Sequence, residues 1–342
     1  MRLYFHKQIL ARAAVLTAVF GFAAGCGGSS PTSPTPKPPE PTPTAPTVTC
    51  PGAITAGSTN GSPVAVSYTT PTASGGVAPV TVACTPASDS PFPVGATTVQ
   101  CTATASDKQT GSCTFQVTVT PPQPRISKTN FLAFGDSLTL GEVTTPVAAT
   151  TDAEGYTSFR LQIVPTAAYP RQLQLQLSAR YTQQAITVTN AGRAGETAND
   201  GAKRFPGIVS STRPEIVLLL EGANDLSALG TTAISTAASA VESMAKEARF
   251  RGARVFIGNL PPSKAGGKNT IPTSTIQSYN TRLVSIASGE GATLVDLYGA
   301  MLSGVNTFIG NDGLHPTELG YQKIAETFFN AIRNDLEVRT TP

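Results

Sequence analysis

The sequence contains two histidines, His6 and His315, and this small number limits where base chemistry can occur. His6 lies in an N-terminal segment with the features of a cleaved signal, so a mature enzyme with a serine nucleophile and a histidine base can only use His315. Asp312 stands three residues earlier in the Gly-rich segment 310–316 (GNDGLHP), where its carboxylate can accept a hydrogen bond from Nδ1–H and leave Nε2 for a hydroxyl. The alternative is a solvated loop histidine beside a turn-forming Asp-Gly.

The hydroxyl that such a base could activate is expected at Ser137, in the hexapeptide 134–139 (FGDSLT) at the end of the apolar run 131–134. A serine at the point where a buried strand breaks into a turn is presented at the carboxyl edge of a sheet, where ligands bind in open α/β folds. Asp136 and Ser137 can alternatively be caps of the next helix. We expect Asp136 to be structural, because Asp312 has the position from which to orient His315.

Two further strand ends carry candidate hydrogen-bond donors for a developing oxyanion. The strand that ends at Thr189 is followed by 190–197 (NAGRAGET), where glycine permits the close backbone approach that an N–H donor requires. The strand that ends at Leu220 is followed by 221–225 (EGAND), where the Asn224 amide can point at the same pocket. Each segment alone is typical of a strand-to-loop turn, but together they converge on the edge that presents Ser137.

The elements that must position these residues alternate along residues 122–342. Helix-length segments at 171–180, 198–209, 233–251, 274–288 and 317–336 separate short apolar strands at 131–134, 186–189, 216–220, 255–257 and 292–297. Continuous apolar strands between amphipathic helices predict an α/β fold with a parallel sheet covered on both faces. The segment between Gly141 and Tyr169, with Tyr156, Phe159 and Leu161, has no firm pattern and is interpreted as a lid or binding wall, or alternatively as an Ω-like surface loop.

The N-terminus predicts export. Residues 1–25 carry basic residues and then an apolar run, and they end in small residues before Cys26, as in a secretory signal. This segment resembles the lipobox of bacterial lipoproteins, although Ala23 departs from the usual leucine. The resemblance implies lipidation of Cys26 and anchoring in the cell envelope without a spanning helix; an ordinary cleaved signal with an incidental cysteine is the alternative. Residues 26–47 are rich in Pro and Thr and predict an extended linker.

The charge balance argues against a nucleic-acid partner. Without the three basic residues of the signal segment, 21 basic residues face 21 acidic ones, so the mature chain is close to neutral.

Residues 48–121 consist of short β-branched runs separated by Gly and Pro, which predicts a small β-sandwich. Four of the five cysteines lie in this region, which favours two disulfides over a zinc site, because no close cysteine pair and no histidine is present. The four cysteines are Cys50, Cys84, Cys101 and Cys113, and they can pair in three ways.

Residues 129–337 resemble the GDSL or SGNH hydrolases, esterases and lipases of flavodoxin-like fold. The resemblance rests on four blocks in order, namely 135–138 (GDSL), Gly195, 222–225 (GAND) and 312–316 (DGLHP). It implies a serine esterase without metal or cofactor, with Ser137 as nucleophile, His315 as base and Asp312 as its partner. It also implies an oxyanion hole built from the Ser137 and Gly195 amides and the Asn224 side chain, with Gly192 as the alternative to Gly195. Short-chain, lipid and acetylated-carbohydrate esters all fit such a site, and the oligomeric state is left open.

Residues 48–121 resemble a hyalin-repeat (HYR) module, an immunoglobulin-like domain. The resemblance rests on 49–51 (TCP), 82–84 (VAC), 90–101 (SPFPVGATTVQC) and 112–115 (SCTF). It implies disulfides from Cys50 to Cys101 and from Cys84 to Cys113, and a role in adhesion or in spacing other domains. The rival interpretation of the whole chain is therefore a cell-surface adhesion or carbohydrate-binding protein in which the hydrolase fold is a passive scaffold.

Overall fold

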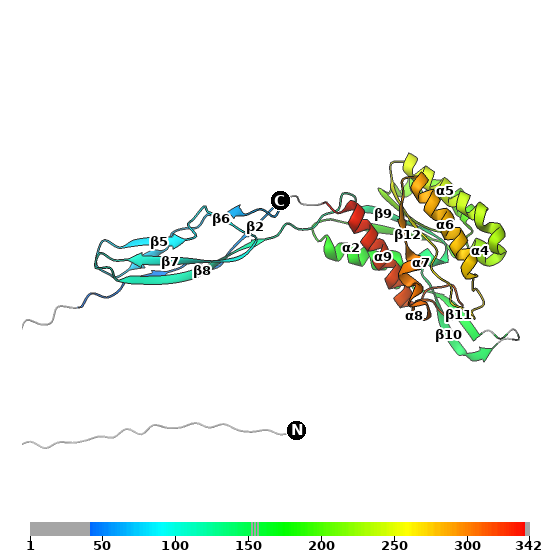
Figure 1. The fold of residues 1–342 in the computed structure, drawn as a ribbon, viewed down its shortest axis with the longest axis horizontal. Coiled ribbons are helices and arrows are strands. Elements are labelled where there is room, and N and C mark those ends of the chain that lie inside the picture. Colours follow the sequence, from blue (N-terminus) through cyan, green and yellow to red (C-terminus); the bar gives the residue numbers. More distant parts are fainter. Residues whose placement is uncertain (1–41, 152, 154, 156, 339–342) are drawn as a thin grey trace, which may run out of the picture.

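The computed structural model describes residues 42–151, 153, 155 and 157–338 (Figure 1). The predicted signal segment, Cys26 and most of the predicted linker lie outside the described residues. Within the described part, none of the helices combines the length and the apolar character that a bilayer crossing requires.

The first described domain is all-β. Its main sheet has the order β2-β8-β7-β5, with β2 (Ile54–Gly57) parallel to β8 (Thr110–Thr120), and with β7 (Gly95–Thr104) antiparallel to both β8 and β5 (Thr81–Thr85). Two short pairs complete it: β1 (Thr47–Thr49) with β4 (Thr72–Ser74), and β3 (Val64–Ala65) with β6 (Pro91–Phe92). Alternating residues of β7 and β8 point inward and pack with Phe92 into a separate core. The predicted all-β, immunoglobulin-like class is confirmed.

This domain begins inside the segment that was predicted as linker. Thr47 already pairs with Ser74 in the β1–β4 ladder. The Gln109 side chain donates a hydrogen bond of 3.0 Å to the Pro43 carbonyl. A Cβ on Gly111 would lie 1.8 Å from the Pro46 carbonyl oxygen, so the chain passes closely over β8 before the first strand.

The disulfide connectivity differs from the one that the HYR resemblance implied. The structure joins Cys50 to Cys113 and Cys84 to Cys101, with Cα–Cα distances of 5.8 and 4.0 Å. Cys84 on β5 lies directly opposite Cys101 on β7, which in turn lies opposite Cys113 on β8. Because β7 separates β5 from β8, Cys84 and Cys113 are two strand spacings apart, roughly 9–10 Å, which exceeds the reach of a disulfide. The expected Cys84–Cys113 and Cys50–Cys101 pairs are therefore wrong for this structure.

The second described domain is a doubly wound α/β fold. Its five strands are all parallel, in the order β12-β9-β13-β14-β15. The strands are β9 (Asn130–Gly135), β12 (Thr187–Gly192), β13 (Ile216–Leu220), β14 (Arg254–Gly258) and β15 (Thr293–Val295). The chain adds β12 on one side of β9 and β13 on the other, so the order reverses between β9 and β13. The carboxyl ends of these strands are where such folds bind ligands.

The helices form two layers that cover the sheet (Figure 1). α2 (Tyr169–Arg180) packs on α9 (Glu318–Leu336), whereas α3 (Ala198–Thr212) packs on α5 (Ile234–Phe250), which contacts α6 (Thr273–Gly289). This arrangement follows from right-handed crossovers that change direction at the switch point. The predicted α/β class with a parallel sheet is confirmed.

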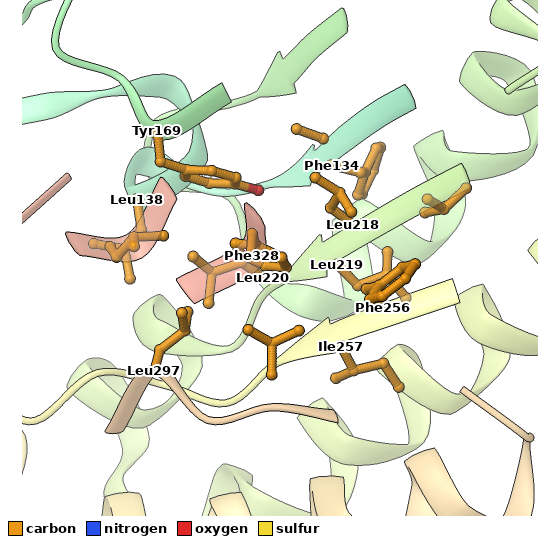
Figure 2. Packing of buried hydrophobic residues seen from close by; sticks show 14 of the residues in the cluster. Phe134, Leu138, Tyr169, Leu218, Leu219, Leu220, Phe256, Ile257, Leu297 and Phe328 are labelled. Atoms are coloured by element: carbon orange, nitrogen blue, oxygen red, sulfur yellow. The ribbon is translucent and has the colours of Figure 1, made fainter. Parts of the chain in front are cut away.

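The core lies between the helices and the sheet, because the central strands are buried on both faces. Every residue of β13 is buried, and so are residues 131–135 of β9. Figure 2 shows Phe134 and Leu218 on neighbouring strands, and Leu220 close to Phe328 of α9. The short helix α1 (Ser137–Leu140) contributes Leu138 to the same core and is thereby held against the sheet.

The segment 141–169 is neither patternless nor an Ω-like loop over most of its length. It forms an antiparallel hairpin of β10 (Glu142–Thr151) and β11 (Thr157–Ile163), which projects from the α/β domain (Figure 1). Tyr156 lies outside the described residues. The register pairs Glu142 with Ile163 and Thr144 with Leu161, so these side chains share one face of the hairpin. Three short helices were not predicted: α4 (Ala223–Leu229), α7 (Leu297–Leu302) and α8 (Val305–Phe308).

Candidate active site

Ser137 is the first residue of α1, immediately beyond the carboxyl end of β9. Only glycine fits at the last position of β9, because a Cβ on Gly135 would lie 2.1 Å from the carbonyl oxygen of Leu220 on β13. The Asp136 side chain accepts a hydrogen bond of 2.9 Å from the Leu138 amide and caps the helix. This cap fixes the turn that presents the Ser137 hydroxyl at the edge of the sheet.

His315 lies in the tight loop that leads into α9. The loop closes on itself through a hydrogen bond of 2.8 Å from the Gly310 amide to the His315 carbonyl. Asp312 Oδ1 accepts from the Leu314 and His315 amides at 3.2 and 3.1 Å, which folds the carboxylate back onto its own loop. Thr317 then caps α9 by accepting from the Gly320 amide.

The three predicted residues form one continuous chain of hydrogen bonds. Asp312 Oδ2 lies 2.5 Å from His315 Nδ1, and His315 Nε2 lies 2.9 Å from Ser137 Oγ. All three side chains are buried. Such a chain fixes the Nδ1–H tautomer and leaves the Nε2 lone pair to accept the serine proton, which is the geometry needed to activate a hydroxyl.

The imidazole is surrounded by negative charge. Burial by itself would lower the pKa of His315, but the hydrogen-bonded carboxylate of Asp312 and the nearby carboxylate of Glu142 outweigh it and raise the pKa to about 9. Burial acts to raise the pKa of Asp312, yet hydrogen bonds from His315 and Asn269 bring it below its ordinary value. Asp312 is therefore ionised at neutral pH and stabilises a protonated imidazole.

Asn224 is the second residue of α4, which follows the neighbouring strand β13 on the same sheet edge as Ser137. Its side-chain amide donates a hydrogen bond of 2.9 Å to the Glu196 carbonyl, in the loop after β12. This bond orients the amide and ties together the two loops that were predicted to supply oxyanion donors. The second N–H of the amide has no hydrogen-bond partner among the described residues.

Gly192 at the end of β12 and Gly195 in the loop that follows differ in whether their backbone amide is free to donate to an oxyanion. The Gly192 amide already donates to Asn190 Oδ1 at 2.9 Å, and a Cβ at this position would lie 2.2 Å from the Leu140 amide nitrogen. Gly195 has a φ of +70° and open space where a Cβ would stand. Within the described part of the chain, neither the Gly195 amide nor the Ser137 amide donates a backbone hydrogen bond, so both remain available to a ligand.

Two residues at the site were not predicted from the sequence. The Asn269 side chain donates 3.1 Å to Asp312 Oδ2, and its backbone amide donates 2.7 Å to the Asp312 carbonyl. Glu142 Oε2 lies 3.4 Å from His315 Nε2. No periodicity or motif marks Asn269, whereas Glu142 could have been found as the only carboxylate shortly after the GDSL block.

Buried acids lie below the serine. Burial raises the pKa of Asp136 to about 7 in spite of the hydrogen bond from Leu138. Burial, and then the charges of Asp136 and Glu196, raise the pKa of Glu221 well above its ordinary value. Neither oxygen of Glu221 has a hydrogen-bond partner among the described residues, which agrees with a neutral carboxyl at neutral pH. Asp136 contacts the helix end rather than His315, consistent with the structural role expected for it.

No cluster of three or more potential metal ligands occurs among the described residues. The hydrogen bonds at the site offer a polarised hydroxyl, a base with a fixed tautomer, and N–H donors on an adjacent edge.

Comparison with known proteins agrees with this site. Residues 133–323 match the model of the GDSL-like Lipase/Acylhydrolase family, and residues 42–119 match the HYR domain. Esterase TesA of Pseudomonas aeruginosa is 26% identical over 148 residues, which are 43% of this chain and 69% of that protein.

Two solved structures are similar to part of this chain. The lipase/acylhydrolase from Enterococcus faecalis is 24% identical with a TM-score of 0.48, over 61% of this chain and 97% of that one. The acetylxylan esterase Axe2 from Geobacillus stearothermophilus is 19% identical with a TM-score of 0.47, over 61% and 96%. Because the family match spans more than half of the sequence, the chain belongs to the GDSL-like lipase/acylhydrolase family and is an ester hydrolase of that family.

Proposed function

We propose that the protein is an exported serine esterase that hydrolyses carboxylic esters through an acyl-enzyme. The observation that carries this proposal is the unbroken chain from Asp312 through His315 to Ser137. As Ser137 Oγ attacks the ester carbonyl, its proton moves to His315 Nε2, and the carbonyl oxygen becomes an oxyanion. His315 then returns this proton to the leaving alcohol as the tetrahedral intermediate collapses.

The second half of the cycle repeats these steps with water. His315 takes a proton from a water molecule that attacks the acyl-enzyme, and it gives the proton back to Ser137 Oγ when the carboxylic acid leaves. The Ser137 and Gly195 amides and the second N–H of Asn224 are the proposed oxyanion donors. Removal of one such donor typically costs 10²–10³ in kcat.

The test is the variant Ser137→Ala with a fluorophosphonate probe and p-nitrophenyl acetate. We expect the native protein to hydrolyse the ester and to be labelled at Ser137, and the variant to lose both properties while it stays folded. Ser178→Ala is the control, because Ser178 is exposed on α2 and its removal leaves the catalytic chain intact. Full hydrolysis by Ser137→Ala would exclude the assignment.

The β10–β11 hairpin is proposed as a wall of the substrate pocket. The face that carries Glu142 beside His315 also carries Thr144, Leu161 and Ile163, and the side chains of Leu161 and Ile163 are 39% and 48% exposed. Exposed aliphatic side chains that continue outward from the catalytic base suit the acyl chain of an ester. Ile163→Asn is expected to raise KM for longer acyl chains more than for acetate, whereas an equal effect on all chain lengths would contradict this role.

Export and anchoring remain proposals from the N-terminal sequence, which lies outside the described residues. A lipid on Cys26 would hold the protein in the bacterial envelope, and two disulfides fit an oxidising compartment. Incorporation of labelled fatty acid by the producing cell should disappear in Cys26→Ala. Equal labelling of both proteins would remove the lipid anchor from the proposal.

A further inference from the structure

Glu142 is the first residue of the hairpin, and it places a second carboxylate against the catalytic imidazole. Its Oε2 lies 3.4 Å from His315 Nε2, the same nitrogen that lies 2.9 Å from Ser137 Oγ, and its side chain is only 14% exposed. The backbone at this position is fixed from two sides. The Tyr321 hydroxyl of α9 donates 2.7 Å to the Glu142 carbonyl, and Ile163 is its partner in the hairpin ladder.

The groups around His315 come from several elements. Asp312 binds Nδ1 from the same loop, and Glu142 faces Nε2 from β10. Asp136, at the start of α1, is a third carboxyl within electrostatic range. Tyr321 of α9 is buried, and its hydroxyl is bonded to backbone carbonyls. Lys264 of the adjoining loop donates to Asn311 Oδ1 at the outer end of the histidine loop.

The two states of the imidazole meet Glu142 differently. When His315 is neutral, Nε2 presents a lone pair toward a carboxylate, which is unfavourable. When Nε2 is protonated, the same carboxylate stabilises the positive charge. We propose that Glu142 acts as a second carboxylate partner of the catalytic base and stabilises the imidazolium that forms as Ser137 attacks the ester. This inference rests on the proposed esterase mechanism and adds a residue to it.

The proposal has a specific kinetic consequence. Below the pKa of His315, the resting enzyme and the transition state both carry an imidazolium, so Glu142 stabilises both equally and does not change the rate. Above that pKa the resting imidazole is neutral, and Glu142 stabilises only the transition state. Glu142 therefore increases the rate at alkaline pH and raises the pKa of the acid limb, while it leaves the rate at lower pH unchanged.

The experiment is the pH dependence of kcat/KM for p-nitrophenyl acetate, from about pH 6 to about pH 10, in native protein and Glu142→Gln. We expect the two profiles to coincide on the acid side. On the alkaline side the plateau of the variant should be about tenfold lower, with the apparent pKa about one unit lower. A structural role would instead lower the whole profile by one factor with no change of pKa, and that result would overturn the proposal.

The matched control is Glu318→Gln. Glu318 lies three residues from His315 on the first turn of α9, but its side chain is exposed. Removal of its charge is expected to move the pKa by less than about 0.3 units, because solvent and salt screen it. A shift as large as that of Glu142→Gln would show a general charge effect and would contradict the specific role.

A direct titration separates this inference from the proposed function. With His6→Gln, His315 is the single histidine of the chain, so its imidazole signals in an NMR titration need no further assignment. We expect Glu142→Gln in this background to lower the measured pKa of His315 by about one unit. An unchanged pKa would overturn the inference even in an active esterase. Absence of hydrolysis and of Ser137 labelling would refute the esterase mechanism, and with it the catalytic role of Glu142, whatever the titration shows.

Discussion

The protonation of His315 should be measurable as a change in stability. The carboxylates of Asp312 and Glu142 raise the pKa of this buried group from 6.5 to about 9 on folding. Because one pKa unit corresponds to about 1.4 kcal/mol, protonation of His315 adds about 3 kcal/mol to the free energy of unfolding. The folded pKa lies above the unfolded one, so this contribution is complete below pH 6.5 and is lost as the pH rises through 9.

The assay is urea unfolding of native protein and His315→Gln, at intervals between about pH 6 and about pH 10. Far-UV circular dichroism follows the α/β domain selectively, because the described helices all lie between residues 137 and 336. The measured quantity is the free energy of unfolding of the native protein minus that of the variant. We expect this difference to fall by about 3 kcal/mol across the range. A difference that stays constant or grows with pH would refute the assignment of charge around the imidazole.

Three further predictions concern other parts of the structure. Asn224→Ala should lower kcat by about 10²–10³ with a small effect on KM, because it removes a proposed oxyanion donor; a change confined to KM would contradict this. Gly192→Ala should lower the stability in thermal melts by about 2–4 kcal/mol, because its Cβ would meet the Leu140 backbone at 2.2 Å. Gly207→Ala in α3 is the control, and it should be neutral or stabilising because the space around a Cβ there is open. Peptide mapping of the unreduced protein should recover the linked pairs Cys50 with Cys113 and Cys84 with Cys101, and the other pairing would show that the strand order is wrong.

The sheet of the α/β domain could be predicted because its strands are buried on both faces. Runs such as 131–134 and 216–220 are continuously apolar, and the structure places strands at both. The hairpin of residues 142–163 escaped prediction for the opposite reason. Its strands project from the domain and mix Thr, Val and Ala with polar residues, so the sequence shows no regular alternation of apolar and polar positions.

The candidate site could be predicted as far as its residues lie in short motifs. Ser137 and Asn224 lie in the first turns of the helices that follow β9 and β13, and His315 lies in the loop that leads into α9. Asn269 and Glu142 contact the site through tertiary packing, and sequence spacing does not report such contacts. The prediction of the cysteine pairing was wrong for the same reason, because the pairing depends on which strands are neighbours in the sheet.

The position of Glu142 links the base to the hairpin. The residue that faces His315 is also the first rung of the β10–β11 ladder, opposite Ile163, while Thr144, two rungs further on the same face, packs against Gly310 of the histidine loop. A displacement of the hairpin at Glu142 relative to the histidine loop would change the distance between Glu142 and His315. Because the attraction between charges falls with distance, an acyl chain along Leu161 and Ile163 that changes this distance would also change the basicity of the imidazole. The pH profile of Glu142→Gln with short and long acyl chains is thus the measurement that joins substrate binding to catalysis: in the native enzyme the pKa of the acid limb of kcat should depend on chain length, and in the variant it should not.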